Sequence, residues 1–187
     1  MSNQINHTLS DGDNYQKVPT PAASVLLIRD TNNQLEVFMI KRSMKTNFGG
    51  AWVFPGGKID NEDISNNYSK YSPQLDDCLA SARLGIEKNG LSYWIACIRE
   101  CFEESSIVIQ ENDMIFVDKS PFKFGALTTF CASTDKTPHI TVNPHSGILE
   151  HSGYEWVTKD QFCSNCLEYL IGPVEHFYSA HSEAYNV

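Results

Sequence analysis

The chain has 187 residues, which is enough for one domain with a buried core and too few for two ordinary domains. Hydrophobic residues make up 41% of the chain and charged residues 20%, proportions that are typical of a globular protein rather than a disordered one. The net charge of −9 argues against binding nucleic acid by phosphate neutralisation, and a polyanionic substrate would need divalent cations to supply positive charge.

The N-terminal residues 1–18 are polar, lack the basic start and apolar core of a secretion signal, and are expected to be disordered. No apolar run approaches the roughly 20 residues of a membrane span. Cysteines stand at positions 78, 97, 101, 131, 163 and 166 without a spaced framework, which favours reduced thiols in an intracellular compartment. Cys163 and Cys166 form a lone C-x-x-C, which is weak evidence for zinc or redox chemistry.

Two short apolar runs, at residues 22–28 and 35–40, begin the expected domain. The polar segment 29–33 separates them, and this pattern predicts a β-hairpin. A glycine-punctuated stretch follows at 48–57, with a short strand expected at 52–54 between the glycine turns.

A first helix is expected after a polar surface loop at 58–71. Ser72 followed by Pro73 predicts an N-cap and a proline at the first helical position, and Asn89-Gly90 predicts the end of the helix. Apolar residues recur at helical spacing between these signals, namely Leu75, Leu79, Ala82 and Ile86.

A second helix is expected from about Ser92 to Ser105, with an apolar stripe formed by Ile95, Ile98 and Phe102. Strands are then expected at 124–132, 139–142 and 153–157, before a helix at about 161–170 and an irregular tail. Strands that flank a helix, without any internal repeat, predict an α+β fold or an α/β/α sandwich.

The second predicted helix carries three glutamates, Glu100, Glu103 and Glu104, within about a third of its circumference, because each residue turns the helix by about 100°. Like charges at this spacing destabilise a helix unless water screens them or a cation lies among them. Carboxylate oxygens suit Mg²⁺ or Mn²⁺, and Mg²⁺ often takes substrate phosphates as further ligands. On the helix alone, a solvated acidic face and a metal site both stay open.

The two segments VFPGGKID and RECFEESSIVI resemble the two ends of the Nudix box, G-x5-E-x7-R-E-U-x-E-E-x-G-U, where U is aliphatic. The matching residues are Gly57, Arg99, Glu100, Glu103, Glu104 and Ile107. Three features depart from the pattern: residues 58–98 replace a much shorter spacer, Ser106 stands at the closing glycine, and Cys101 stands at an aliphatic position. Asp63 has the spacing of the first glutamate of the box, but the helix predicted beyond it leaves that assignment open.

A split box of this kind resembles the coenzyme A diphosphatase branch of the Nudix superfamily, which carries a long insertion inside the box. The resemblance is strongest over residues 40–60 and 93–108, and it identifies 58–91 as the insertion. It implies an α/β/α sandwich with a mixed β-sheet and a catalytic loop–helix–loop, over a domain at 19–171 followed by a tail at 172–187. It also implies a peroxisomal protein, although no S-K-L type address ends the chain, with a cytoplasmic protein as the alternative; a homodimer is left open.

In that family the helix glutamates hold divalent metal ions, which assigns Mg²⁺ or Mn²⁺ to Glu100, Glu103 and Glu104 and gives Glu103 a catalytic role as well. The resemblance implies that Arg99 pairs with a carboxylate and fixes the helix against the loop. Gly56 and Gly57 would let the backbone turn tightly into the site. Arg42, with Lys41 beside it, is a candidate for contact with a phosphate, although exposed basic residues at strand ends are ordinary.

A further carboxylate is expected from a loop before a strand that carries Glu155-Trp156. Glu150, five residues earlier, is the candidate general base, and a solvent-exposed loop glutamate is the alternative. His145 and His151 flank this loop and are candidates for substrate contact, although surface histidines are more common.

The implied reaction is hydrolysis of a pyrophosphate bond in a nucleoside diphosphate linked to another moiety, first of all coenzyme A or acyl-CoA, giving 3′,5′-ADP and (acyl-)4′-phosphopantetheine. ADP-ribose, dinucleotides and capped RNA are the alternative substrates, and the acidic charge counts against RNA. From another class, a catalytically inactive Nudix module could bind a nucleotide or a protein partner. Ser106 and the abbreviated segment between Ile107 and Phe124 favour that alternative.

Overall fold

The computed structural model describes residues 20–31, 34–46, 48–65, 74–122, 125–144, 146–166 and 170–185. The segment expected to be disordered, 1–18, lies outside the described residues, as do Ser72, Pro73 and His145. Within those ranges no helix combines the length and the apolar character that crossing a membrane would require.

The predicted hairpin is present as β1 (Ala22–Thr31) and β2 (Gln34–Arg42), which pair antiparallel. The expected short strand is β3 (Trp52–Val53), which pairs with β2, and a further strand that the sequence did not predict is β4 (Gly56–Lys58), which pairs with the start of β1. The glycine-rich stretch therefore runs from one side of the hairpin to the other.

The first predicted helix is shorter than expected, because α1 spans Asp77–Leu84. Its N-cap is Asp76, whose carboxylate accepts the backbone N–H of Leu79 at 2.8 Å, whereas the predicted cap residues Ser72 and Pro73 lie outside the described residues. Gly85 ends the helix in the left-handed conformation at φ 64°, ahead of the predicted stop at Asn89-Gly90.

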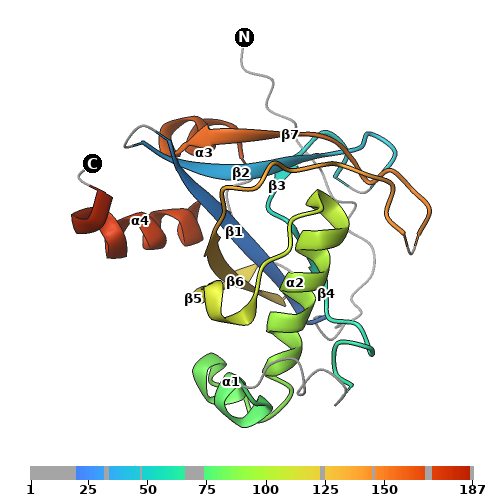
Figure 1. Cartoon of the computed structure of the whole chain (residues 1–187), viewed down its shortest axis with the longest axis vertical. Coiled ribbons are helices and arrows are strands. Elements are labelled where there is room, and N and C mark those ends of the chain that lie inside the picture. The colour runs from blue at the N-terminus through green and yellow to red at the C-terminus, as the bar shows by residue number, and fades with distance from the viewer. Residues whose placement is uncertain are drawn as a thin grey trace, which may run out of the picture.

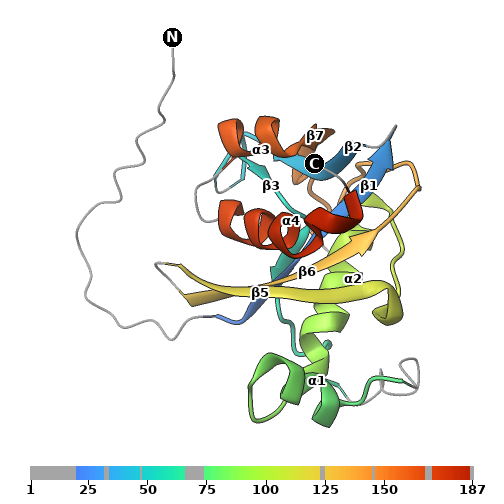
Figure 2. The same cartoon turned by 90° about the vertical axis from the view of Figure 1, so that its left-hand side faces the viewer.

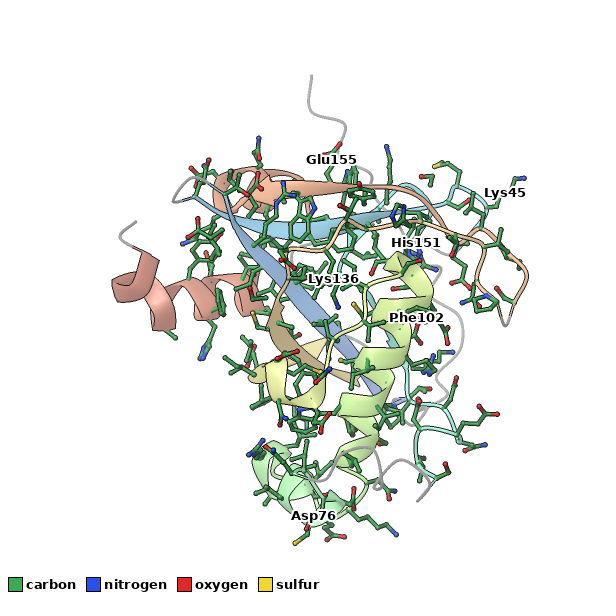
Figure 3. The ribbon with its side chains drawn as sticks, viewed as in Figure 1. Lys45, Asp76, Phe102, Lys136, His151 and Glu155 are labelled. Atoms are coloured by element: carbon green, nitrogen blue, oxygen red, sulfur yellow. The ribbon has the colours of Figure 1, made fainter. Side chains whose placement is uncertain are left out.

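The second helix, α2, spans Leu91–Ser105, close to the prediction, and Ile95 and Ile98 of the predicted stripe are partly buried against the core, but Phe102 is not part of the buried face. Trp94, Cys97 and Cys101 are fully or almost fully buried, whereas 51% of Phe102 is exposed (Figure 3). Small thiols and one large indole, rather than a row of aliphatic residues, pack this helix onto the sheet.

The second half of the chain forms a short 3-10 helix (Glu111–Asp113), β5 (Met114–Phe122), β6 (Gly125–Ser133), β7 (His151–Thr158), α3 (Lys159–Asn165) and α4 (Ile171–Tyr185). The predicted strands at 124–132 and 153–157 are confirmed as β6 and β7. The predicted strand at 139–142 is wrong, since those residues form no strand, and β5 was not predicted. The helix expected to reach residue 170 ends at Asn165, and α4 replaces the irregular tail.

The seven strands form one mixed sheet in the order β3-β2-β1-β6-β5, with β4 beside β1 and β7 beside β2. Strands β1 and β6 are parallel, and the other pairs are antiparallel. Alternate residues of β1 enter opposite cores: Val25 and Leu27 face α1 and α2, while Leu26 and Ile28 face α3 and α4 (Figures 1 and 2). The predicted α/β/α sandwich with a mixed sheet is therefore confirmed.

The insertion between the two halves of the motif is docked on the start of α2 through α1. The carboxylate of Asp77 accepts the backbone N–H groups of Asn89 and Leu91 at 2.9 and 3.0 Å, and the hydroxyl of Ser81 accepts that of Gly90 at 2.8 Å. These bonds satisfy the free N–H groups at the start of α2. The N-cap residue of α2 is Gly90, which has no side chain to accept them.

Candidate active site

The C-terminal half of α2 lies against Gly56 and Gly57 (Figure 1). The tight turn expected at these two glycines is wrong, because both belong to β4 and pair with β1, and the bend precedes them at Pro55. We call this bend, together with the two glycines, the glycine turn. The backbone N–H of Gly56 donates to Oε2 of Glu104 at 2.9 Å. A Cβ atom at Gly57 would overlap the carboxylate of Glu100, so only glycine fits there without moving that side chain. Both glycines named from the sequence thus contact helix glutamates, which lets the backbone approach the acidic face closely.

Arg99 joins the helix to the loop after β4. Its Nε and Nη2 donate to the two carboxylate oxygens of Asp63 at 3.0 and 2.9 Å, and Nη2 also donates to the carbonyl of Lys58 at 3.1 Å. The side chain of Asp63 is fully buried. A bidentate, charge-assisted pair of this kind fixes both distance and orientation between the two segments.

The same guanidinium also faces two of the helix glutamates. Nη1 of Arg99 donates to Oε1 of Glu100 at 2.9 Å and lies 3.7 Å from Oε1 of Glu103. Oε2 of Glu103 in turn accepts from the side-chain amide of Asn143 at 3.4 Å. Glu104, by contrast, accepts a backbone N–H, that of Gly56.

Burial makes the charged forms of Glu100 and Glu104 unfavourable. It raises the pKa of Glu100, with the charge and hydrogen bond of Arg99 opposing the shift and the charge of Glu103 adding to it. Burial and then the charge of Glu100 place the pKa of Glu104 well above its ordinary value, against the opposing effects of the Gly56 N–H and Arg42. One arginine does not neutralise this group of acids, and an added cation would stabilise their ionised forms.

The three glutamates fit the oxygen-ligand chemistry of Mg²⁺ or Mn²⁺, but they do not form a ready cage. Over the part of the chain that the structure describes, no three His, Cys, Asp or Glu side chains are grouped closely enough to hold a metal ion. The reason is local: Glu100 and Glu103 turn toward Arg99, and Glu104 turns toward Gly56. A cation would therefore have to draw the carboxylates away from partners that they already have.

The loop between β6 and β7 closes over the C-terminal end of α2. Glu150 lies half-buried in this loop, where its carboxylate accepts the hydroxyl of Ser146 at 3.1 Å and its carbonyl accepts the N–H of Ser43 at 2.7 Å. Its charge also contributes to raising the pKa of Glu104, after burial and the charge of Glu100. Glu155, by contrast, is exposed on β7 (Figure 3).

A pocket of about 230 Å³ adjoins the glycine turn. Its lining includes Arg42, the candidate for phosphate contact, together with Lys58, which follows Gly57, and Phe48. Lys41 points elsewhere and lies 5.4 Å from the ring of Trp52. Positive charge next to the glycine turn is what an anionic phosphate group requires.

Two residues at this site could not be assigned from the sequence. Asn143 follows the segment that was expected to be a strand, and no spacing signal links it to Glu103. The sequence marks His151 as a candidate for substrate contact, with an exposed surface histidine as the alternative; it is instead 2% exposed and lies at the last turns of α2, and no spacing signal links it to Glu104 (Figure 3). Burial, and then the charge of Arg42, lower the pKa of His151 to about 4, so its imidazole is neutral near pH 7.

The cysteines whose side chains the structure describes have free thiols, namely Cys78, Cys97, Cys101, Cys131 and Cys166. The side chain of Cys163 lies outside the described residues, so the C-x-x-C stays a prediction.

The chain resembles solved structures of one kind. No family model matches the sequence. An Ap4A hydrolase from C. elegans superposes with a TM-score of 0.57 over 87% of this chain and 98% of that one, at 14% identity. A MutT Nudix hydrolase from Burkholderia pseudomallei gives 0.55 over 86% and 98%, at 17% identity. The chain has the fold of the Nudix hydrolases.

Two further similarities concern ligands and sequence. The Nudix domain of NrtR from Shewanella oneidensis, solved with ADP ribose, superposes with a TM-score of 0.52 over 85% of this chain and 88% of that one, at 18% identity. The acyl-coenzyme A diphosphatase NUDT19 of Xenopus laevis is 34% identical over 107 residues, which cover 45% of this chain and 28% of the relative. The chain thus matches less than a third of the length of that curated relative.

The Arg99–Asp63 pair gives a first prediction. Replacing Arg99 with Met leaves the fully buried Asp63 carboxylate without its cation, which is expected to lower the free energy of unfolding by about 3–5 kcal/mol. Adding Asp63→Asn to that variant should recover part of the loss, because the buried charge is removed. Urea unfolding of both variants measures this, and a loss below about 0.5 kcal/mol for Arg99→Met would contradict the assignment.

The raised pKa of Glu104 gives a second prediction. A carboxyl whose pKa is higher in the folded than in the unfolded chain stabilises the fold below its ordinary value of 4.5, and this stability is lost as pH rises through the folded-state pKa. In a chelator, Glu104→Gln should therefore be more stable than wild type near neutral pH, with the difference shrinking on acidification toward about pH 4.5. Thermal melts across this range test it, and added Mn²⁺ should narrow the difference by stabilising wild type.

Proposed function

We propose that the chain hydrolyses a pyrophosphate bond in a nucleoside diphosphate linked to another moiety, using Mg²⁺ or Mn²⁺ held by Glu100, Glu103 and Glu104. The observation that carries the proposal is the buried, under-neutralised acidic face of α2 beside the Gly56 and Gly57 turn. An acidic face that served only solubility would be exposed, whereas only 7% of Glu103 and 6% of Glu104 is accessible.

When bound, the divalent cation would neutralise phosphate charge and acidify a water molecule. The residues of the chain would supply the rest. Arg99 would hold the acidic helix against the loop, and Arg42 would meet a phosphate oxygen from the adjoining pocket. Glu150 would accept the proton of the attacking water as a new O–P bond forms and the bridging P–O bond breaks.

For the substrate, we propose coenzyme A or acyl-CoA, which would yield 3′,5′-ADP and (acyl-)4′-phosphopantetheine. The similarity to an acyl-coenzyme A diphosphatase supports this choice, together with the insertion that splits the motif. ADP-ribose and dinucleotides are the second candidates, supported by the likeness to an ADP ribose-bound domain and to an Ap4A hydrolase. Peroxisomal or cytoplasmic location and a homodimer stay predictions.

The proposal predicts metal-dependent turnover. Purified protein with Mg²⁺ or Mn²⁺ should release 3′,5′-ADP from coenzyme A, measured by chromatography, and should act more slowly on ADP-ribose, Ap4A and capped RNA. Chelation should abolish turnover. Glu104→Gln should lower kcat by about 10²–10³-fold, the size expected when one group that stabilises charge is removed from an active site.

Glu175→Gln is the matched control, because Glu175 is exposed on α4 and undergoes the same chemical change. Glu150→Gln should lower kcat by about 10²–10⁴-fold if Glu150 is the general base. The absence of metal-dependent turnover on every diphosphate would leave the inactive nucleotide-binding module as the better account. Turnover that survives Glu104→Gln would instead refute the site assignment.

A further inference from the structure

His151 is a buried histidine at the candidate site whose position the proposed chemistry has not used. Only 2% of it is exposed, and its Nε2 lies 3.5 Å from Oε1 of Glu104. This nitrogen makes no hydrogen bond within the described part of the chain. A buried polar atom without a partner costs desolvation free energy, so its placement next to a carboxylate calls for a physical reason.

The backbone brings His151 to this place through an irregularity in the sheet. His151 begins β7 and is the register partner of Arg42 on β2, and the register shifts between Lys41 and Arg42. Such bulges re-aim side chains at the ends of strands. The hydrogen bond from the N–H of Ser43 to the carbonyl of Glu150 holds the two segments together just beyond the bulge.

The carboxylate of Glu104 consequently faces a different group on each oxygen. Oε2 accepts the backbone N–H of Gly56 at 2.9 Å, and Oε1 faces Nε2 of His151. If Nε2 carries its proton and donates to Oε1, the carboxylate is restrained on both oxygens, and each oxygen keeps a further lone pair for another partner. Glu100 and Glu103 instead face the guanidinium of Arg99, at 2.9 and 3.7 Å.

We propose that His151 is a positioning residue for Glu104, and that its Nε2–H restrains Oε1 while the Gly56 N–H restrains Oε2, so that Glu104 is preoriented for a divalent cation. This inference rests on the proposed metal-dependent function. Restraint of a metal ligand by an outer hydrogen bond raises affinity because less orientational freedom is lost on binding. His151 itself does not need to touch the cation or the substrate.

The test is Mn²⁺ binding measured by calorimetry on the full chain, without substrate. His151→Leu should weaken Mn²⁺ binding by about 10–100-fold, the range for outer partners of metal ligands. His151→Gln should restore most of the affinity, because a glutamine amide can donate from about the position of Nε2, whereas His151→Asn is too short and should not. His176→Leu, at an exposed position of α4, is the matched control and should bind as wild type does.

The possible results distinguish the role of His151 from the proposed metal site. If wild type and Glu104→Gln bind Mn²⁺ equally poorly, the metal site fails and takes the inference with it. If Glu104→Gln loses affinity while His151→Leu keeps it, the site stands and the role of His151 is refuted. Thermal melts check folding. Should His151→Leu unfold, the Gln and Asn variants decide: retained affinity in Gln with loss in Asn supports the inference, and equal affinity overturns it.

Discussion

The guanidinium of Arg99 is the interaction on which the rest of the site depends. It binds both oxygens of the buried Asp63, the carbonyl of Lys58 and the carboxylate of Glu100, so one side chain ties the acidic helix to the loop that follows the glycine turn. Without it, several carboxylates would lie close together with little access to water. Burial lowers the pKa of Arg99, but the hydrogen bonds and charges of Asp63 and Glu100 raise it above its usual range. Arg99 therefore stays protonated.

This arrangement also explains how a long insertion is tolerated inside the motif. The insertion begins after Lys58 and ends at the start of α2. Near its first residues, Arg99 of α2 binds Asp63 and the carbonyl of Lys58. At the far end, Asp77 and Ser81 of α1 bind the backbone that enters α2. The helix is therefore held at both ends, and the glutamates keep their place beside Gly56 and Gly57 whatever the insertion contains between these two anchors.

Glu100 and Glu104 are held at a cost to stability. Burial disfavours their charged forms, and Arg99 and Gly56 offset only part of that effect. Groups of buried acids that lower stability in this way are often functional, because a bound cation would offset the unfavourable burial of their charge. Glu100 and Glu103 both face the guanidinium of Arg99, at 2.9 and 3.7 Å, so a divalent cation would share these carboxylates with Arg99.

Much of the fold could be predicted from local pattern. The hairpin follows from the alternation in β1 and β2, and α2 follows from its length and the motif that it carries. The errors have physical causes. Strand β5 is an edge strand that contains Asp118, Lys119 and Pro121, and an edge tolerates such residues without an apolar run. The segment at 139–142 has strand-like residues, but the N–H of His139 binds the carbonyl of Ser105 at the end of α2 instead.

The C-terminal helix and part of the site could not be predicted from local pattern either. Helix α4 begins at Ile171 and has Gly172 and Pro173 in its first turn, where proline is tolerated. It forms because Val174, Phe177 and Tyr178 pack into the second core. The motif led directly to Arg99 and the three glutamates. Asn143 and His151 come from a distant loop and strand, so only the register shift beside Arg42 and the closure of that loop bring them to the helix.

The most direct test of the central claim is a crystal structure of the chain with Mn²⁺, using anomalous scattering to locate the ion. The account predicts an anomalous peak between α2 and the glycine turn, with oxygens of Glu100, Glu103 and Glu104 within about 2.0–2.6 Å, the range for oxygen ligands of hard divalent cations. A peak elsewhere, or no peak while Glu100 and Glu103 remain on Arg99 at saturating Mn²⁺, would contradict it.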